Sequence, residues 1–223
     1  MFRFISWIST IEHRSKTIRS TEWKTIHQEP GYTIHLVPST PYTSHISWAR
    51  IQYERNFIKN IISSYSRVAD KPGVMLLWDP AVFVSDLIIP FVQTLNCKLV
   101  MDVIDLWPEL FRVALPRPLQ FLFTIVSFPL FYRRNQLYEV ADGAIAVTED
   151  YLAVYKKINA SVPTQTVYLG INYKDFQLDT REEGEQTIRG ITKEKDEVWI
   201  IYAGTLGEHY DIQTMLNVAL RLE

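Results

Sequence analysis

Residues 74–103 have the sequence VMLLWDPAVFVSDLIIPFVQTLNCKLVMDV, in which two short apolar runs flank a longer segment. Val74 to Trp78 and Lys98 to Val103 are almost continuously apolar, which is typical of strands buried on both faces of a sheet. Ser85 to Leu95, between them, has the length of a helix. Continuously apolar strands separated by helices predict a parallel sheet covered by helices.

The same alternation continues along the chain. It predicts an α/β fold, a Rossmann-like doubly wound parallel sheet with helices on both faces. Outside residues 74–103 we expect strands at Phe2 to Ile8, Tyr32 to Val37, Ala144 to Thr148 and Thr166 to Leu169, and helices at Ser15 to Gln28, Trp48 to Tyr65, Pro118 to about Val140 and Glu149 to Lys156.

The last residues predict the start of a second domain. Glu197 to Ala203 has the pattern of a buried strand, and Asp211 to Glu223 that of an amphipathic helix. One strand and one helix do not make a domain, since the strand needs neighbours and the helix needs a second layer. We therefore expect a Rossmann-like domain at 1–176, a linker at 177–196, and at 197–223 the first βα unit of a truncated second domain.

Composition narrows the class of protein. The chain is 47% apolar, enough for a substantial core, and 23 Lys and Arg nearly balance 25 Asp and Glu, which argues against a dedicated nucleic-acid binder. The single Cys97 excludes an internal disulfide and favours a reducing cytosol, and the histidines show no metal-binding spacing. Leu119 to Tyr132 is apolar but too short to span a bilayer, which indicates a buried or membrane-surface helix.

Ligands of such sheets bind beyond the carboxyl ends of the strands. The turns that follow the expected strands there contain no dinucleotide fingerprint and no Walker loop, so a nicotinamide enzyme or a P-loop kinase is disfavoured. They are Asp79-Pro80, Asp105-Leu-Trp-Pro-Glu109, Gly170-Ile-Asn172 and Gly204-Thr-Leu-Gly207.

At these turns the chain resembles the family 4 glycosyltransferases, which have the two-domain GT-B fold. The resemblance implies that residues 1–176 are the acceptor-side domain and that residues 197–223 begin the donor-binding domain. Met101-Asp-Val-Ile-Asp-Leu-Trp-Pro-Glu-Leu110 is similar to the Asp-x-x-Asp-Leu-Trp-Pro-Glu element of bacterial surface-polysaccharide members. Three further stretches, in the family's order, support the resemblance. They are Ala141 to Asp150, Leu169-Gly-Ile-Asn172 and Ile201-Tyr-Ala-Gly-Thr-Leu-Gly207.

The resemblance also indicates departures from the family pattern. The first strand and Gly-rich loop of the family, and most of its donor-binding domain, have no counterpart, so we expect a fragment. Ile104 stands where many relatives have a basic residue, and Glu208-His-Tyr210 where more distant ones have a Lys-Gly pair.

The activity implied by the resemblance is transfer of a sugar from a nucleotide-diphosphate sugar to a lipid-linked glycan acceptor, with retention, in surface polysaccharide synthesis. Without a metal or cofactor, backbone N–H groups and a helix N-terminus stabilise the leaving diphosphate. Gly204, Thr205 and Gly207 are the expected donor-phosphate residues, because glycine lets the backbone approach phosphate oxygens. The alternative for the glycines is a tight turn.

Acceptor-side candidates lie in the Asp-x-x-Asp-Leu-Trp-Pro-Glu element. Asp102 and Asp105 suit hydrogen bonds to acceptor hydroxyls or proton removal, or alternatively close the sheet and cap a turn. Trp107 suits a sugar-binding wall or core packing, and Glu109 an acceptor contact or a solvated helix N-terminus.

His13 and Lys16 are further acceptor-side candidates, because relatives in this subgroup show a similar His and Lys pattern at the edge of the cleft. The alternative is a solvated helix face.

The resemblance leaves two other functions open. One is a non-catalytic or split subunit that needs a partner chain, and the other is a nucleotide-sugar epimerase of the same fold. We expect the 223-residue chain to be inactive by itself, and the complete enzyme to be cytoplasmic, with peripheral contact at the inner face of the cell membrane and no nucleic-acid partner.

Overall fold

The computed structural model describes residues 4–13, 16–19, 22–43, 47–68, 71–113, 115–170, 187–188, 191–194, 197–202, 204 and 211–221. The chain divides into two compact units, residues 1–168 and 169–223, and each is described by itself. The predicted linker at 177–196 stays a prediction.

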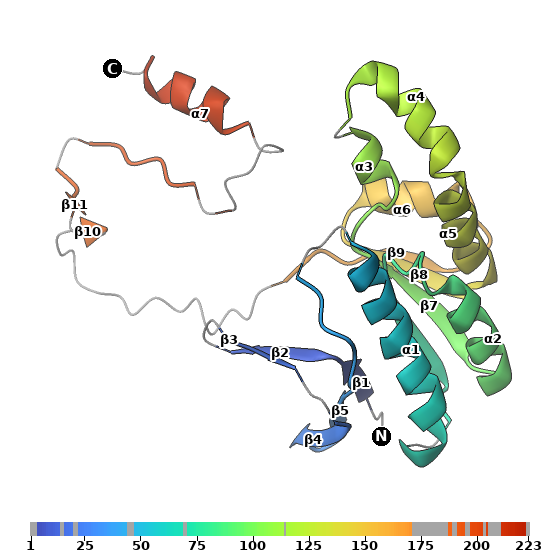
Figure 1. The fold of residues 1–223 in the computed structure, drawn as a ribbon. Helices are drawn as coiled ribbons and strands as arrows, with labels where there is room; N and C mark the ends of the chain where they lie inside the picture. The colour runs from blue at the N-terminus through green and yellow to red at the C-terminus, as the bar shows by residue number, and fades with distance from the viewer. Residues whose placement is uncertain are drawn as a thin grey trace. The chain divides into compact units, whose positions relative to one another are not determined.

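A four-stranded parallel sheet forms the centre of the first unit (Figure 1). Its strands, in spatial order, are β6 (Val74–Asp79), β7 (Lys98–Val103), β8 (Gly143–Ala146) and β9 (Thr164–Thr166). Each successive pair is parallel, and helices connect β6 to β7, β7 to β8 and β8 to β9. The mixed α/β architecture with a parallel sheet is therefore confirmed.

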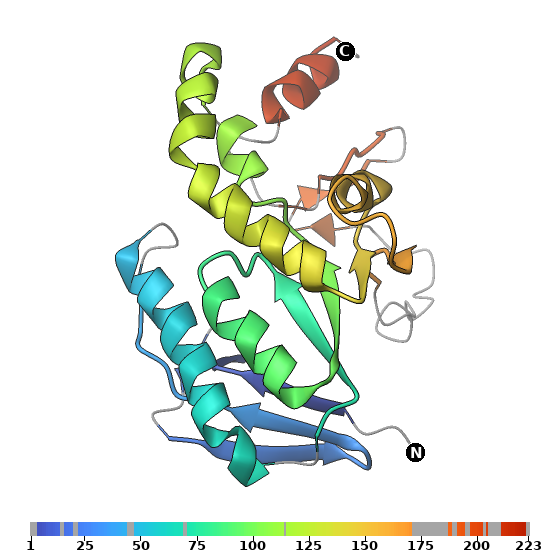
Figure 2. The same cartoon turned by 90° about the vertical axis from the view of Figure 1, so that its right-hand side faces the viewer.

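Helices pack on the sheet face that carries Leu99, Met101 and Val103, which are fully buried. Residues of α2 (Ser85–Leu95), α5 (Phe128–Val140) and α6 (Glu149–Lys156) complete this core, and α1 (Trp48–Val68) packs beside α2 (Figure 2). A second apolar cluster contains Val37 and residues of α1 and α2, among them Phe91. Three helices, α2, α5 and α6, thus pack on one apolar face of the parallel sheet.

The opposite face of the sheet is open among the described residues. Val74, Leu76 and Trp78 of β6 lie on this face and are 59%, 58% and 68% exposed. In the described part of the chain, then, the second helical layer of a doubly wound fold is not present on β6. The apolar run predicted burial on both faces, whereas the burial alternates from one residue to the next.

The expected helix at Ser15 to Gln28 is wrong, because this segment forms strands. β2 (Thr10–His13) pairs antiparallel with β3 (Lys16–Arg19), and β4 (Lys24–Glu29) pairs antiparallel with β5 (Tyr32–Leu36). β1 (Phe4–Ile8) runs parallel to β5, so the second sheet has the order β1-β5-β4. The segment is rich in Thr and Ile, whose branched side chains favour strands.

The predicted helical stretch after Pro118 consists of two helices, with a short one before them. α3 (Glu109–Val113) precedes α4 (Arg117–Val126), and Ser127 separates α4 from α5. The Ser127 N–H and hydroxyl both donate to the carbonyl oxygen of Phe123, at 2.8 and 2.6 Å. Ser127 thus closes the last turn of α4, and Pro129 falls in the first turn of α5, where its missing N–H costs nothing.

The second unit contains a short antiparallel pair, β10 (Thr187–Ile188) with β11 (Ile191–Thr192), and α7 (Ile212–Ala219). The predicted final helix is confirmed over α7, and the Asp211 side chain caps it by accepting the Thr214 N–H at 3.0 Å. The predicted buried strand at Glu197 to Ala203 is wrong over its described residues, 197–202. They form no strand, and Val198 is 88% exposed, because no described neighbouring strand pairs with them.

Candidate functional site

Several of the predicted site residues lie just beyond the carboxyl end of β7. The strand ends at Val103, the following loop carries Asp105 and Trp107, and α3 begins at Glu109. Asp79 ends the neighbouring strand β6, directly beside Val103 in the register of the sheet. This edge is where a parallel sheet offers its ligand-binding loops.

An ion pair fixes the end of this loop. Nη1 of Arg134, on α5, lies 2.5 and 2.6 Å from the two carboxylate oxygens of Glu109, and 3.4 Å from the Trp107 carbonyl oxygen. The Arg134 side chain is 5% exposed and the Glu109 side chain 26%. Glu109 does begin α3, as the alternative of a helix N-terminus expected, but its carboxylate is only partly solvated and neutralises a buried guanidinium.

Trp107 is held between two helices and a loop. The guanidinium carbon of Arg50, on α1, lies 4.8 Å from the centre of the Trp107 ring, and Nε of Arg50 donates to Glu54 at 2.9 Å. The rings of Phe111 and Phe83 meet the indole edge-on at 4.7 and 6.4 Å. The half-buried indole thus has a fixed position with a cation over one face.

Asp79, at the end of β6, holds the loop after β6 and helix α5 together through its two carboxylate oxygens. Its Oδ1 accepts the Ala81 N–H at 2.9 Å, and its Oδ2 accepts the Tyr138 hydroxyl at 2.6 Å. Burial raises the pKa of Asp79 to about 6, although the hydrogen bond from Tyr138 opposes this rise. Burial also raises the pKa of Tyr138, so the phenol keeps its proton and remains the donor. With both oxygens occupied, Asp79 positions the strand end.

Asp102 and Asp105 occupy different surroundings. Asp102 lies within β7, beside Trp78 and Ile145 in the register, on the open face of the sheet. It is half-buried, and burial raises the pKa of its carboxyl group. Asp105 is exposed in the loop. Neither carboxylate has a hydrogen bond or ion pair with another described residue, so the two side chains do not form a carboxylate pair there.

His13 and Lys16 lie on a hairpin of their own. His13 and Lys16 are partners in the register at the end of the β2–β3 pair. The alternative in which they belong to a helix face is therefore wrong. Among the described residues, neither β2 nor β3 pairs with a strand of the β1-β5-β4 sheet or of the parallel sheet.

Of the expected donor-phosphate residues, only Gly204 lies within the described residues. A Cβ atom at this position would approach the Tyr202 hydroxyl oxygen to 2.7 Å, so a side chain here requires the Tyr202 ring to move. Thr205 and Gly207 lie outside the described residues. Their proposed contact with phosphate stays a prediction.

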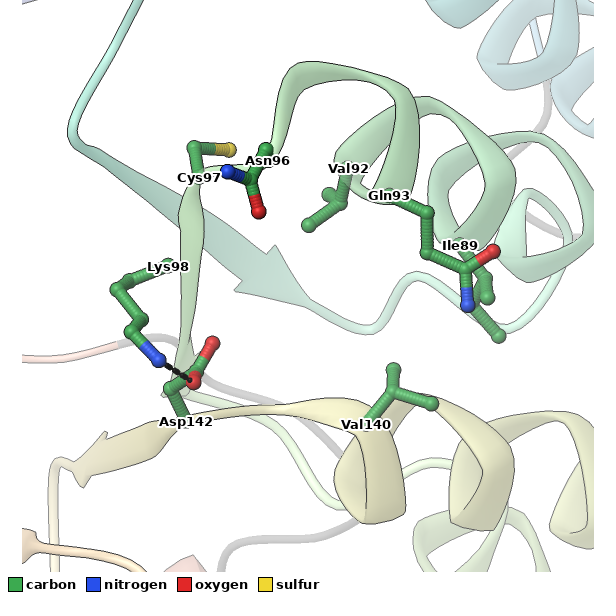
Figure 3. A pocket seen from close by; sticks show the side chains of 8 residues that line it. All are labelled: Ile89, Val92, Gln93, Asn96, Cys97, Lys98, Val140 and Asp142. Atoms are coloured by element: carbon green, nitrogen blue, oxygen red, sulfur yellow. Dashed lines mark hydrogen bonds and ion pairs between the residues drawn. The ribbon is translucent and has the colours of Figure 1, made fainter.

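A pocket of about 360 Å³ lies at the other end of the parallel sheet (Figure 3). Nζ of Lys98, at the start of β7, lies 2.6 Å from Oδ1 of Asp142, and this contact lowers the pKa of the Asp142 carboxyl group. The two charges neutralise each other, which leaves little to hold a charged ligand. The remaining lining residues are Ile89, Val92, Gln93, Asn96, Cys97 and Val140.

Sequence reasoning missed Arg50 and Arg134, the two cations of the site. Arg134 gave no clear signal, because it stands among Arg133, Asn135 and Gln136, and the sequence does not show that its side chain is buried. Arg50 gave none for the same reason, since it lies on a helix with several other polar residues. Within the described part of the chain, no group of His, Cys, Asp and Glu is arranged to hold a metal ion.

Comparison with known proteins does not assign the chain to a family. No protein-family model matches the chain, and no curated protein matches it.

Proposed function

We propose that this chain forms the acceptor side of a retaining GT-B glycosyltransferase, which transfers a sugar from a nucleotide-diphosphate sugar to a lipid-linked glycan. The observation that carries the proposal is the cluster of Trp107, Arg50, Glu109 and Arg134 beyond the end of β7. It coincides with the Asp-x-x-Asp-Leu-Trp-Pro-Glu element and with the edge of the sheet at which such folds bind ligands.

The cluster suits the sugar part of the acceptor. The apolar faces of a sugar ring pack on an indole, and the guanidinium of Arg50 over the Trp107 ring holds that indole in place. Arg50 is itself neutralised by Glu54, so the sugar-binding part of the cluster is the indole. Asp105 is exposed in the same loop and is the carboxylate we assign to an acceptor hydroxyl, as hydrogen-bond acceptor.

In the proposed transfer, the bond from the anomeric carbon to the diphosphate oxygen breaks, and the acceptor oxygen bonds to the same face of that carbon. The leaving diphosphate oxygen takes the electron pair of the broken bond and develops negative charge, and the proton of the acceptor hydroxyl passes to that oxygen. Backbone N–H groups at Gly204, Thr205 and Gly207 are the groups we assign to stabilise this charge. The chain's own contribution at the acceptor is to bind and orient it.

A binding titration tests the acceptor assignment. The probe is a short-chain polyprenyl diphosphate N-acetylhexosamine, added to the purified chain in a calorimeter. We expect saturable binding that Trp107→Ala weakens by about tenfold, or about 1.4 kcal/mol. Trp78→Ala, which removes an exposed indole outside the cluster, is the matched control and should bind like the unaltered chain.

Two results would count against the proposal. One is the absence of binding by a chain whose circular dichroism shows that it is folded. The other is equal binding by the Trp107→Ala chain, since the acceptor would then lie elsewhere. Interconversion of a nucleotide sugar with no acceptor present would instead favour the epimerase.

A further inference from the structure

Helix α4 has the composition of a buried helix but is not buried. Six of its ten residues are large and apolar, yet none of the ten is buried, and its neighbours are the short helix α3 and the start of α5. A helix that is apolar on most of its surface normally lies inside a core or against a membrane. In Figure 1, α4 extends at the end of the helical layer.

Its exposed apolar side chains continue into α5. We call them the α4 ridge, and its most exposed members are Phe121, Val126 and Phe128, at 75%, 71% and 65%. The ring of Phe128 stacks with that of Tyr132, with centres 6.4 Å apart, which extends the surface one turn further along α5. The other members are Leu119, Leu122 and Ile125.

The segment that carries the ridge contains charges of a single sign. From Leu110 to Tyr138 the sequence contains four arginines and no Asp or Glu. Arg134 is neutralised by Glu109, whereas Arg112 and Arg117 are exposed just before and at the start of α4. An apolar surface flanked by cations, with no acid within it, complements an anionic lipid headgroup layer, which offers negative charge above an apolar interior.

We infer that the α4 ridge docks in the plane of an anionic lipid bilayer, with its apolar side chains below the headgroups and Arg112 and Arg117 among the phosphates. Neither α4 nor α5, with 10 and 13 residues, has the length of about 20 residues that spanning requires. The contact is therefore interfacial. The inference does not depend on sugar transfer, because it is based on exposure and charge alone.

Docking would bring the candidate site close to the bilayer. Exposed Tyr132 and buried Arg134 are two residues apart on α5, which is about 3 Å along a helix axis. The same helix thus joins the lipid-facing surface to the site.

Vesicle co-sedimentation tests the inference. The full 223-residue chain is mixed with phosphatidylcholine vesicles that contain or lack phosphatidylglycerol. We expect binding only to the anionic vesicles, and a loss of binding at high salt, since the attraction is partly screened. The double variant Phe121→Ser with Ile125→Ser should bind about tenfold more weakly, and Arg112→Gln with Arg117→Gln should also lose most of the salt dependence.

A matched control removes apolar groups elsewhere. Val74→Ser with Leu76→Ser alters two side chains that are exposed to a similar degree on the open sheet face, and should bind vesicles like the unaltered chain. Circular dichroism checks that each variant is folded. Equal vesicle binding by the ridge variant, or no binding by the unaltered chain, would overturn the inference. The inference would also be overturned if, without lipid, the unaltered chain and the sheet-face control were dimers and the ridge variant a monomer. The ridge would then contact a second copy of the chain.

Discussion

Arg134 and Glu109 join α5 to the loop that follows β7, with Nη1 of the arginine 2.5 and 2.6 Å from the two carboxylate oxygens. The arginine is almost fully buried and the glutamate only partly. Removing the carboxylate therefore leaves a buried charge without its partner, which is the costly way to break an ion pair.

We predict that Glu109→Gln lowers the free energy of unfolding by on the order of 3 kcal/mol, measured by urea denaturation at pH 7. Lys98→Gln is the control, because it breaks an ion pair in which the lysine side chain is 70% exposed. Its cost should be much smaller than that of Glu109→Gln, because water screens an exposed ion pair. Equal costs for both substitutions would show that the Glu109 contact is no stronger than a surface pair.

The buried carboxyl group of Asp79 predicts a pH dependence of stability. Its pKa is 3.8 in ordinary surroundings and about 6 in the folded chain. Between these values the folded chain holds a proton that the unfolded chain has released, so the free energy of unfolding falls as pH rises from about 4 to 6. At about 1.4 kcal/mol for each pH unit, the contribution amounts to at most about 3 kcal/mol.

Asp79→Asn isolates this contribution, because asparagine accepts the Ala81 N–H and can donate to the Tyr138 oxygen without carrying a charge. The difference in free energy of unfolding between the two chains should change over pH 4 to 6 and stay constant from pH 7 to 8. A constant difference over the whole range would contradict the raised pKa.

Tyr138 and Tyr155 form a matched pair for a test of the buried hydroxyl groups. Tyr138 donates to the Asp79 carboxylate at 2.6 Å, whereas Tyr155 donates to the Tyr138 carbonyl oxygen at 3.2 Å. Tyr138→Phe leaves a buried carboxylate oxygen without its donor, so we expect a loss of about 2 to 3 kcal/mol, against about 1 kcal/mol for Tyr155→Phe. Thermal unfolding at pH 7.5 measures both, and the reverse order would be inconsistent with the proposed support of β6.

The elements near residues 74–103 were predictable because local pattern and tertiary contacts agree there. The helix Ser85–Leu95 and the strand Lys98–Val103 have the bounds that the sequence indicates. The hairpin at β2 and β3 was missed, since a run of Thr, Ile and charged residues fits either period until its pairing partner is known. The strand expected at 197–202 failed for the converse reason, because it has no described partner.

The site divides in a similar way. Trp107 and Glu109 stand in a short recognisable element, so the sequence pointed to them directly. The residues that hold them, Arg50 and Arg134, come from two helices that only the tertiary fold brings to this loop. The spacing of residues along the chain does not predict such contacts between distant segments.

The central claim, that an acceptor binds beside Trp107, is tested most directly by fluorine NMR of the chain labelled with 5-fluorotryptophan. The six tryptophans give separate signals, and Trp107→Phe assigns one of them. Titration with the short-chain polyprenyl diphosphate N-acetylhexosamine should shift the Trp107 signal and leave that of Trp78 unchanged. An unchanged Trp107 signal at saturating ligand, or a shift confined to other tryptophans, would contradict the claim.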